Sequence, residues 1–234
     1  DLIKDDIFRI YPKLKPYFKL TVYDVADKIL GGFDARLGNY AMKKFKRNGI
    51  DIRTGTKIKE LKEDRLILAD DTEIKVGMVV WATGLGPNPF IKSLPFAKDK
   101  SQRLLTNGFL QVLKENHEAI PDVYSLGDCA VIEHYNLPQT AQVAQQKGKY
   151  LAKVLNELPK SPHPFTYHHK GAMAYVGDWK ALVDTPTFIK ESGFLAWVFW
   201  RSSYLTMIVS WKNKILIPTY WFLTWAFGRD TSRL

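Results

Sequence analysis

Val123-Tyr-Ser-Leu-Gly-Asp128 is an apolar segment that ends in a glycine and a carboxylate. Glycine lets the backbone approach a ligand closely, and an aspartate in this position can accept hydrogen bonds from the hydroxyl groups of a polyol. A plain turn closed by the Asp128 side chain fits the same residues equally well. Met78-Val-Val-Trp81 is a second apolar run, and it leads directly into Ala82-Thr83-Gly84. Both patterns predict strands, and the second is typical of a buried parallel strand that ends at a ligand-facing turn.

A helix is predicted from Thr140 to Asn156, because apolar residues recur at helical spacing and Pro159 follows. The free amides and the positive dipole at its N-terminus suit a developing negative charge on a cofactor. Its first turns carry glutamines, which are usually only solvated on a helix surface: Gln142, Gln145 and Gln146.

The first part of the chain predicts a strand, a helix and a small sheet. Tyr17–Tyr23 has strand composition, and a helix from Asp34 to Arg47 stops at Asn48-Gly49. Four short strands are expected next, at Ile50–Arg53, Thr56–Leu61, Arg65–Ala69 and Thr72–Lys75. Asp24 follows the first strand, where a carboxylate can bind the hydroxyls of a ribose. No G-x-G-x-x-G precedes it, so a solvated carboxylate that caps the next turn is the stronger interpretation.

Composition narrows the class of protein. The 234 residues are 46% hydrophobic and carry a formal charge of +10, which indicates a globular chain of one large or two small domains. The single cysteine, Cys129, excludes an internal disulfide framework and a multi-cysteine metal site, and a buried thiol is its commonest role. His168 and His169 are neighbours that point to opposite faces of an extended chain, so no metal site is expected.

The C-terminal region is unusually aromatic. A hairpin is expected at Ala172–Gly177 and Trp179–Val183, after a linker at Ser161-Pro-His-Pro164. No later apolar run reaches the ~18 residues that a membrane span needs. Tryptophans beside cations suit the membrane interface, and the residues expected there are Trp197, Trp200, Arg201, Trp211, Lys212, Lys214, Trp221 and Trp225. A core helix or a dimer interface is the alternative, and the absence of any nucleic-acid-binding signature argues against a nucleic-acid partner.

Taken in order, five segments resemble the type II (alternative) NADH:quinone oxidoreductases, especially the mitochondrial enzymes of plants and fungi. They are Val80-Trp-Ala-Thr-Gly84, Val123–Asp128, Thr140-Ala-Gln-Val-Ala-Gln-Gln146, Gly148-Lys-Tyr-Leu-Ala152, and Phe194–Trp211 with the closing Phe227-Gly-Arg-Asp230. The resemblance runs from about Val22 to the C-terminus. It implies a Rossmann-like, glutathione-reductase-like α/β flavoprotein with two dinucleotide-binding domains and an amphipathic membrane-binding domain at its C-terminus.

The resemblance also implies an N-terminally incomplete chain, since both glycine-rich loops of the family are missing and the sequence starts at Asp1. Residues 1–77 correspond to the remainder of the NAD(H)-binding domain and residues 78–158 to the returning part of the FAD-binding domain. Residues 160–234 correspond to the membrane-anchoring and dimerisation domain. On this interpretation the chain alone holds no cofactor.

The function that the resemblance implies is electron transfer from NADH through FAD to ubiquinone at a membrane surface, without proton pumping. It implies a peripheral homodimer in the respiratory chain of the mitochondrial inner membrane, although Ser232-Arg233-Leu234 is close to a peroxisomal address. Two alternatives are a soluble FAD-dependent pyridine-nucleotide reductase of the same fold and a non-catalytic membrane-binding fragment. The tail argues against the first, and the missing phosphate loops motivate the second.

Site residues follow from the resemblance position by position. On the NAD side it implies Asp24, whose charge disfavours NADPH, and Ala82, Thr83 and Gly84, where nicotinamide and flavin meet. On the FAD side it implies Gly127, Asp128, Thr140, Ala141 and Gln142. Gln142 and Gln145 would border the quinone, and many relatives carry a histidine where Gln145 stands.

Overall fold

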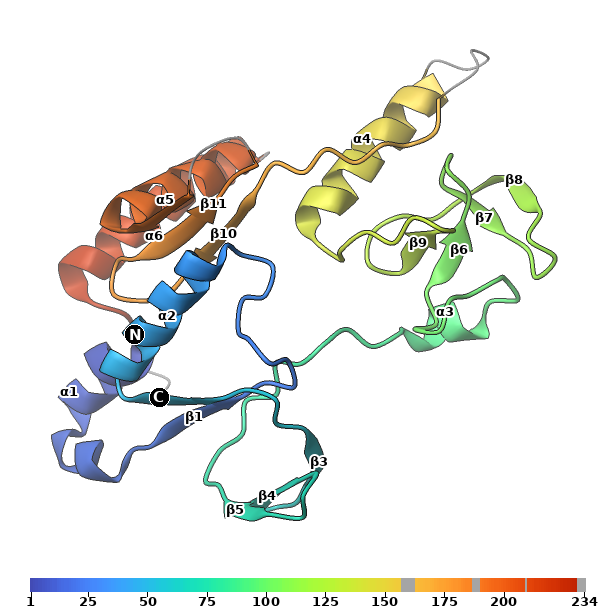
Figure 1. The fold of residues 1–234 in the computed structure, drawn as a ribbon. Coiled ribbons are helices and arrows are strands. Elements are labelled where there is room, and N and C mark those ends of the chain that lie inside the picture. The colour runs from blue at the N-terminus through green and yellow to red at the C-terminus, as the bar shows by residue number, and fades with distance from the viewer. Residues whose placement is uncertain (157–162, 187–189, 209, 231–234) are drawn as a thin grey trace. The chain divides into compact units, whose positions relative to one another are not determined.

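The computed structural model describes residues 1–156, 163–186, 190–208 and 210–230. The expected linker at residues 161–164 therefore lies partly outside the described residues, and the C-terminal residues 232–234 lie wholly outside them. The chain forms two compact units. One combines residues 1–79 with residues 169–234, and the other spans residues 80–168 (Figure 1).

The first unit contains a β-α-β element with parallel strands. β1 (Leu20–Tyr23) pairs in parallel with β2 (Ile50–Arg53), and α2 (Ala35–Arg47) connects them. The helix starts where the Asp34 carboxylate accepts a hydrogen bond of 2.9 Å from the amide of Arg36, as an N-cap does. These boundaries confirm the predicted helix. The predicted strand is shorter than expected, because Tyr17 belongs to the 3-10 helix η2 (Pro12–Tyr17) and the next two residues are irregular.

Two further helical pieces, η1 (Leu2–Ile7) and α1 (Phe8–Ile10), precede η2. Downstream, β3 (Ile58–Leu61), β4 (Arg65–Leu68) and β5 (Glu73–Lys75) form an antiparallel sheet. The turn between β4 and β5 closes where the Asp70 side chain accepts a hydrogen bond of 3.0 Å from the amide of Thr72. The small sheet is therefore confirmed, with its strands trimmed at their ends.

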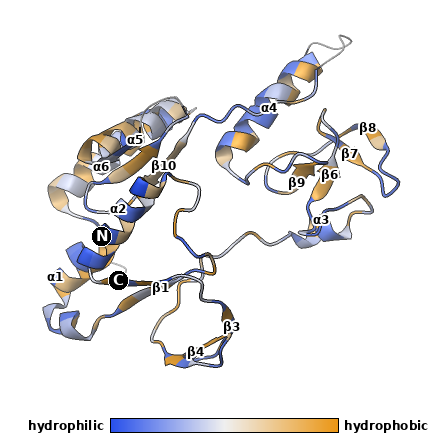
Figure 2. Cartoon of the chain, viewed as in Figure 1, coloured by the Kyte–Doolittle hydropathy of each residue, from blue (hydrophilic) through white to orange (hydrophobic). Residues whose placement is uncertain are grey.

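The C-terminal part of the first unit is a three-stranded antiparallel sheet followed by two helices. The strands are β10 (Ala172–Tyr175), β11 (Ala181–Asp184) and β12 (Lys190–Gly193), and the helices are α5 (Phe194–Met207) and α6 (Trp211–Phe227). The expected hairpin corresponds to β10 and β11. β12 was not predicted, since its sequence is polar and ends in glycine. Figure 2 shows α5 and α6 largely in pale and orange tones, whereas α2 carries broad blue bands.

β11 is buried on both faces, because helices lie on each side of the sheet. Leu182 packs in a cluster with Leu37 and Ala41 of α2, while Ala181 and Val183 pack with Ala196 of α5. Side chains alternate between the faces of a strand, so adjacent residues reach different helices. Full burial of a side chain such as Leu182 contributes about 1.5–3 kcal/mol. The C-terminal sheet therefore packs against α2 on one face and against α5 on the other.

Polar contacts fasten both ends of α2 to this sheet. At the N-terminal end, the Lys190 ammonium lies 2.8 Å from the Asp34 carboxylate, and the Asp34 amide donates a hydrogen bond of 2.8 Å to Asp184. At the C-terminal end, Asp178 accepts hydrogen bonds from Lys44 at 2.8 Å and from Asn48 at 3.0 Å. These bonds fix the orientation of the helix on the sheet.

The second unit is a four-stranded sheet beside a long helix. Its strand order is β8-β7-β6-β9, and the bounds are β6 (Leu104–Thr106), β7 (Gln111–Leu113), β8 (Ala119–Tyr124) and β9 (Ala130–Ile132). β6 and β9 are parallel and the other pairs antiparallel. The helices are α3 (Pro89–Ser93) and α4 (Ala141–Asn156), and α4 matches the predicted helix. The apolar run at Val123–Leu126 is only partly a strand, because β8 ends at Tyr124.

The expected strand at Met78–Trp81 is absent, and this prediction was wrong for the structure. The segment is irregular, and its side chains are exposed: Met78 by 77%, Val80 by 77% and Trp81 by 57%. A parallel strand of this composition is buried only when strands flank it. None of the strands in the described ranges pairs with these residues. Separately, none of the described helices is long and apolar enough to cross a membrane.

Candidate functional site

The predicted turn at Gly127-Asp128 lies between β8 and β9. Gly127 has a φ of +87°, which glycine adopts without strain. The Asp128 side chain is exposed, while its backbone carbonyl accepts a hydrogen bond of 2.7 Å from the Gln139 side chain. The turn is thus held by its backbone and leaves the carboxylate free to meet a ligand.

The N-terminus of α4 lies beside this turn. The hydroxyl of Thr140 accepts a hydrogen bond of 3.4 Å from the amide of Val143, which caps the helix, and Ala141 is exposed. One small pocket is shared by the turn and the helix, and it is lined by Gly127, Asp128, Ala130, Leu137, Pro138, Gln139, Thr140, Val143, Ala144 and Lys147. The structure therefore brings together three of the residues that the resemblance assigns to the FAD side, Gly127, Asp128 and Thr140.

Lys147 is a member of this pocket that the sequence analysis did not identify. Its side chain is 2% exposed, and burial lowers the pKa of its ammonium, with Arg103 adding to the effect. Lysine is almost never fully buried unless it is paired. The signal that could have found it is its spacing of seven residues from Thr140, which places both on one helix face.

The glutamines of α4 differ in their contacts. The Tyr167 hydroxyl donates a hydrogen bond of 2.8 Å to the side-chain oxygen of Gln142. Gln146 donates one of 2.8 Å to the backbone oxygen of His168 and accepts one of 3.0 Å from its amide. Gln145 is exposed. Two of the three glutamines therefore hold the segment before His169 along the helix rather than being merely solvated.

Tyr167 is itself constrained. Burial raises the pKa of its phenol, and Tyr135 adds to the shift, so the hydroxyl keeps its proton and donates to Gln142. The Tyr167 hydroxyl therefore fixes the orientation of the Gln142 side-chain amide.

Asp24 and the Ala82–Gly84 segment belong to different units. Asp24 follows β1, and its side chain accepts a hydrogen bond of 2.9 Å from the amide of Ala26, which is the turn-capping contact expected of an aspartate there. Its backbone is anchored to Arg53 and Thr56. Ala82, Thr83 and Gly84 are exposed and irregular. These residues are accessible in the structure.

The aromatic C-terminal residues divide into two groups. Arg201 lies between two indoles, 4.8 Å from the ring centre of Trp197 and 3.7 Å from that of Trp221. Trp200 stacks on Tyr175 at 5.4 Å. Burial lowers the pKa of Arg201. These predicted lipid-contacting residues are partly buried within the unit.

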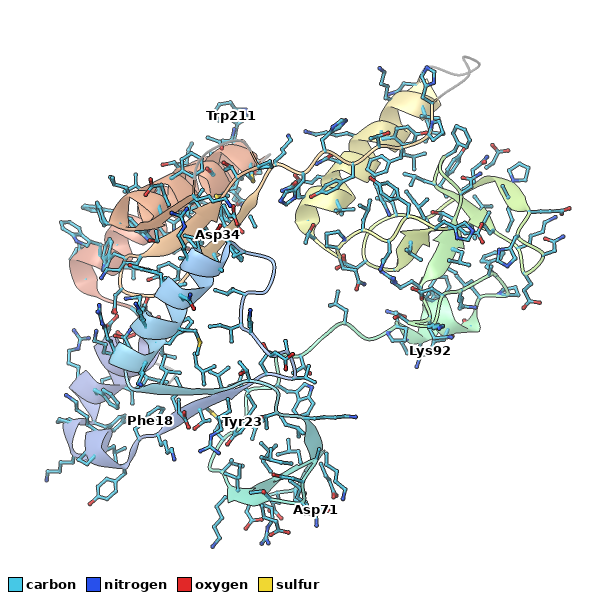
Figure 3. All side chains as sticks on the ribbon, viewed as in Figure 1. Phe18, Tyr23, Asp34, Asp71, Lys92 and Trp211 are labelled. Atoms are coloured by element: carbon cyan, nitrogen blue, oxygen red, sulfur yellow. The ribbon has the colours of Figure 1, made fainter. Side chains whose placement is uncertain are left out.

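The other group faces outward. Trp211 is 77% exposed and Trp225 69%, Lys212 is exposed, and the Lys214 ammonium lies 4.7 Å from the Trp211 ring centre. Figure 3 shows Trp211 projecting away from the start of α6. Further exposed large apolar residues on the two helices are Phe194, Leu195, Val198, Phe199, Tyr204, Met207, Ile215, Leu216, Tyr220, Phe222, Leu223 and Phe227. An apolar surface this extensive marks an interaction site.

Within the described ranges, no three His, Cys, Asp or Glu side chains gather in a group that could hold a metal ion. Cys129 is half-buried rather than buried, and its thiol donates a hydrogen bond of 3.5 Å to the backbone oxygen of Leu126.

Comparisons with known proteins match the whole chain. Residues 13–148 match the model of the pyridine nucleotide-disulphide oxidoreductase family, and residues 169–230 match the NDH2 C-terminal domain. The chain is 38% identical over its full length to the mitochondrial internal alternative NAD(P)H-ubiquinone oxidoreductase A1 of Arabidopsis thaliana, and covers 49% of that protein. It is also 38% identical to a probable NADH dehydrogenase of Dictyostelium discoideum, with 99% of this chain and 51% of that one aligned.

The chain thus spans about half the length of these relatives. Among solved structures, NDH2 of Plasmodium falciparum in complex with NADH superposes with a TM-score of 0.87 at 17% identity, over 98% of this chain and 62% of that one. At 17% identity the structural likeness establishes the fold alone. The family relationship is shown by the family model that matches residues 13–148. The chain belongs to the pyridine nucleotide-disulphide oxidoreductase family, and its C-terminal residues match the NDH2 C-terminal domain.

Proposed function

We propose that this chain is the C-terminal part of a flavoprotein that transfers electrons from NADH through FAD to ubiquinone at a membrane surface without pumping protons. The observation that carries the proposal is the pocket where the N-terminus of α4 meets the Gly127-Asp128 turn. The names of its relatives, mitochondrial NAD(P)H-ubiquinone oxidoreductases, support the same reaction.

The residues of the pocket fit a flavin. Gly127 lets the backbone approach, the exposed Asp128 carboxylate can accept hydrogen bonds from ribityl hydroxyls, and Thr140, Ala141 and Gln142 form the helix terminus that can face the ring. A flavin held by these residues would supply the hydride-accepting and electron-transferring chemistry of the reaction. The chain's own contribution is to orient the ring and to lower the energy of a negative charge on it.

The nucleotide side of the proposal rests on Asp24 at the end of β1, where a carboxylate can bind the adenine ribose and repel the extra phosphate of NADPH. We assign residues 1–77 to NADH binding and residues 78–158, which include Ala82–Gly84, to FAD binding. The sequence holds no glycine-rich pyrophosphate loop, so we propose that stable cofactor binding needs additional chain, such as the relatives' greater length provides.

On the quinone side, we propose that Gln142 and Gln145 border the substrate. Tyr167 supports this role for Gln142, because its hydroxyl holds the side-chain oxygen and so fixes the orientation of the amide. Gln145 is exposed and can approach a ligand directly.

We assign residues 160–234 to attachment at the mitochondrial inner membrane as a peripheral homodimer. The support is the exposed apolar surface of α5 and α6 with Lys212 beside it, which suits a lipid interface and anionic headgroups. A second copy of the chain could cover part of the same surface. A peroxisomal location is the alternative that the last three residues motivate.

Two measurements test the proposal. The chain and a version lengthened to the size of the relatives are purified in mild detergent with FAD, and NADH and a soluble quinone analogue are added. The lengthened protein should show flavin absorption that bleaches with NADH and recovers with quinone. Absence of quinone reduction in a protein that binds flavin would favour a reductase with another acceptor, and absence of flavin would favour a non-catalytic part.

The second measurement is flotation with phospholipid vesicles. Flotation of the chain supports the membrane assignment. A chain that stays at the bottom of the gradient as a dimer would instead assign the apolar surface to self-association.

A further inference from the structure

Lys147 is a buried cation that the fold does not neutralise. Its side chain is 2% exposed, and within the described ranges it has neither a carboxylate partner nor a hydrogen-bond acceptor. Removing an isolated ammonium from water is costly unless an anion or acceptors replace the lost hydration. The ammonium of Lys147 therefore forms no contact within the described part of this unit that would offset the cost of burying its charge.

The side chain lies on the face of α4 that forms the pocket. Thr140, Ala144 and Lys147 are four and three residues apart, which places them in one row along the helix. Helical side chains lean toward the N-terminus, so the Lys147 stem runs back along this row. All three residues line the pocket together with Gly127 and Asp128.

The ammonium retains access to open space. Among the described residues, no side-chain nitrogen or oxygen is completely enclosed without a partner. Because Lys147 has no partner, its nitrogen keeps some accessible surface, and the residue lines the pocket. The cation is thus nine-tenths buried and still reachable from the cavity.

The surrounding charges favour a negative ligand. Thr140, at the start of α4, lines the pocket, and a helix N-terminus carries a positive partial charge. Arg103 adds to the effect of burial on Lys147, although it is itself paired with Asp99 at 2.7 Å. Asp128 lines the same pocket, but its carboxylate is exposed and makes no ion pair with Lys147. Two independent positive features, the helix terminus and the lysine, therefore converge on one small space.

We propose that Lys147 stabilises the negative charge that a flavin ring carries after reduction, so that the pocket binds the reduced cofactor more tightly than the oxidised one. This inference rests on the proposed function, because it takes the flavin as the ligand of the pocket. The lysine is a tuning residue: it sets the difference in affinity between the two redox states and takes no proton or electron itself.

The test uses the protein lengthened to the size of the relatives, with Lys147→Met and the control Lys149→Met. Lys149 is exposed on the same helix, so its variant removes an equal charge outside the pocket. Dissociation constants for FAD are measured under anaerobic conditions in the oxidised and the reduced state. We expect Lys147→Met to weaken binding of reduced FAD about tenfold or more relative to oxidised FAD, as loss of one charged contact does. Lys149→Met should leave that ratio unchanged.

A second measurement separates this role from a structural one. In the 234-residue chain without cofactor, Lys147→Met should raise the midpoint of thermal unfolding, because it removes an unpaired buried charge. A lower midpoint would overturn the inference, since the lysine would then serve the packing. Equal weakening of both redox states would overturn it as well while leaving the proposed function intact. A lengthened protein that binds no FAD in either state would overturn both proposals.

Discussion

The ammonium of Lys44 in α2 donates a hydrogen bond of 2.8 Å to the carboxylate of Asp178, in the turn between β10 and β11. The Lys44 side chain is 9% exposed, so this bond joins two parts of the chain more than a hundred residues apart in a partly dry environment. Asp178 also accepts hydrogen bonds from Asn48 and Lys4. The turn therefore depends on a helix that belongs to a distant part of the sequence.

Replacement of Asp178 by Ala should lower the free energy of unfolding of the first unit by about 1–3 kcal/mol, because Lys44 would remain buried without its carboxylate. Urea denaturation followed by tryptophan fluorescence measures the change. Lys4→Ala is the matched control, since that partner is 60% exposed and should cost less than 1 kcal/mol. Equal effects of the two variants would show that the buried bond has no special weight.

Stability of the first unit should fall in acid. The Lys190 ammonium and the Arg36 amide hold the pKa of Asp34 at about 2, and Lys44 holds the pKa of Asp178 well below its usual range. A carboxylate with a lowered folded-state pKa contributes stability that is complete above its unfolded pKa of about 4 and is lost as the pH falls toward the folded value.

The midpoint of urea unfolding should therefore be constant near pH 6 and decline between about pH 4 and pH 2. The double variant Asp34→Asn, Asp178→Asn should flatten this decline. Asp27→Asn, at an exposed carboxylate of the same unit, should leave the profile as it is. A profile that declines equally in all three proteins would assign the acid sensitivity to other carboxylates.

The two groups of C-terminal tryptophans should respond differently to truncation. Trp225→Ala, at a side chain 69% exposed, should leave thermal stability unchanged and weaken binding to anionic vesicles about tenfold. Trp197→Ala removes an indole that contacts Arg201 and Trp179, and should cost roughly 2 kcal/mol of stability or more. Vesicle flotation and thermal unfolding of both variants measure these effects. Loss of stability in Trp225→Ala without any loss of vesicle binding would contradict the membrane assignment.

Tyr167→Phe tests the role assigned to Gln142. Loss of the 2.8 Å hydrogen bond should cost about 0.5–1.5 kcal/mol of stability in the second unit. In the lengthened protein the variant should raise the KM for a quinone analogue more than it lowers kcat. The Gln142 side chain is still present, but its amide is no longer oriented by the tyrosine. Gln145→Ala should leave stability unchanged, since that side chain is exposed, and raise the same KM. Quinone kinetics untouched by either variant would remove both glutamines from the quinone site.

Much of this fold could be predicted from periodicity and turn chemistry. Asp34 and Asn48-Gly49 mark the ends of α2, and the glycine and carboxylate at residues 127–128 mark the turn between β8 and β9. These signals are local, because caps and turns depend on the few residues that form them.

The rest depends on distant partners. An apolar run such as Met78–Trp81 becomes a buried strand only beside neighbouring strands, which the run itself does not encode. Likewise, α5 and α6 are apolar on most sides, so the sequence could not separate the tryptophans that contact Arg201 from those that face outward. Lys147 was missed because lysine is usually a solvated residue on a helix.

The strand that carries Leu182 and Val183 has a consequence for exchange of segments between relatives. One face of β11 is covered by α2, from the first 50 residues, and the other by α5. A chimera that takes only the C-terminal region from a relative would set one parent's strand against the other parent's helix. Steric fit across that joint, rather than the position of the domain boundary in the sequence, therefore decides which pieces of this family can be recombined. Helix α2 and the C-terminal sheet should therefore be exchanged together, from the same parent.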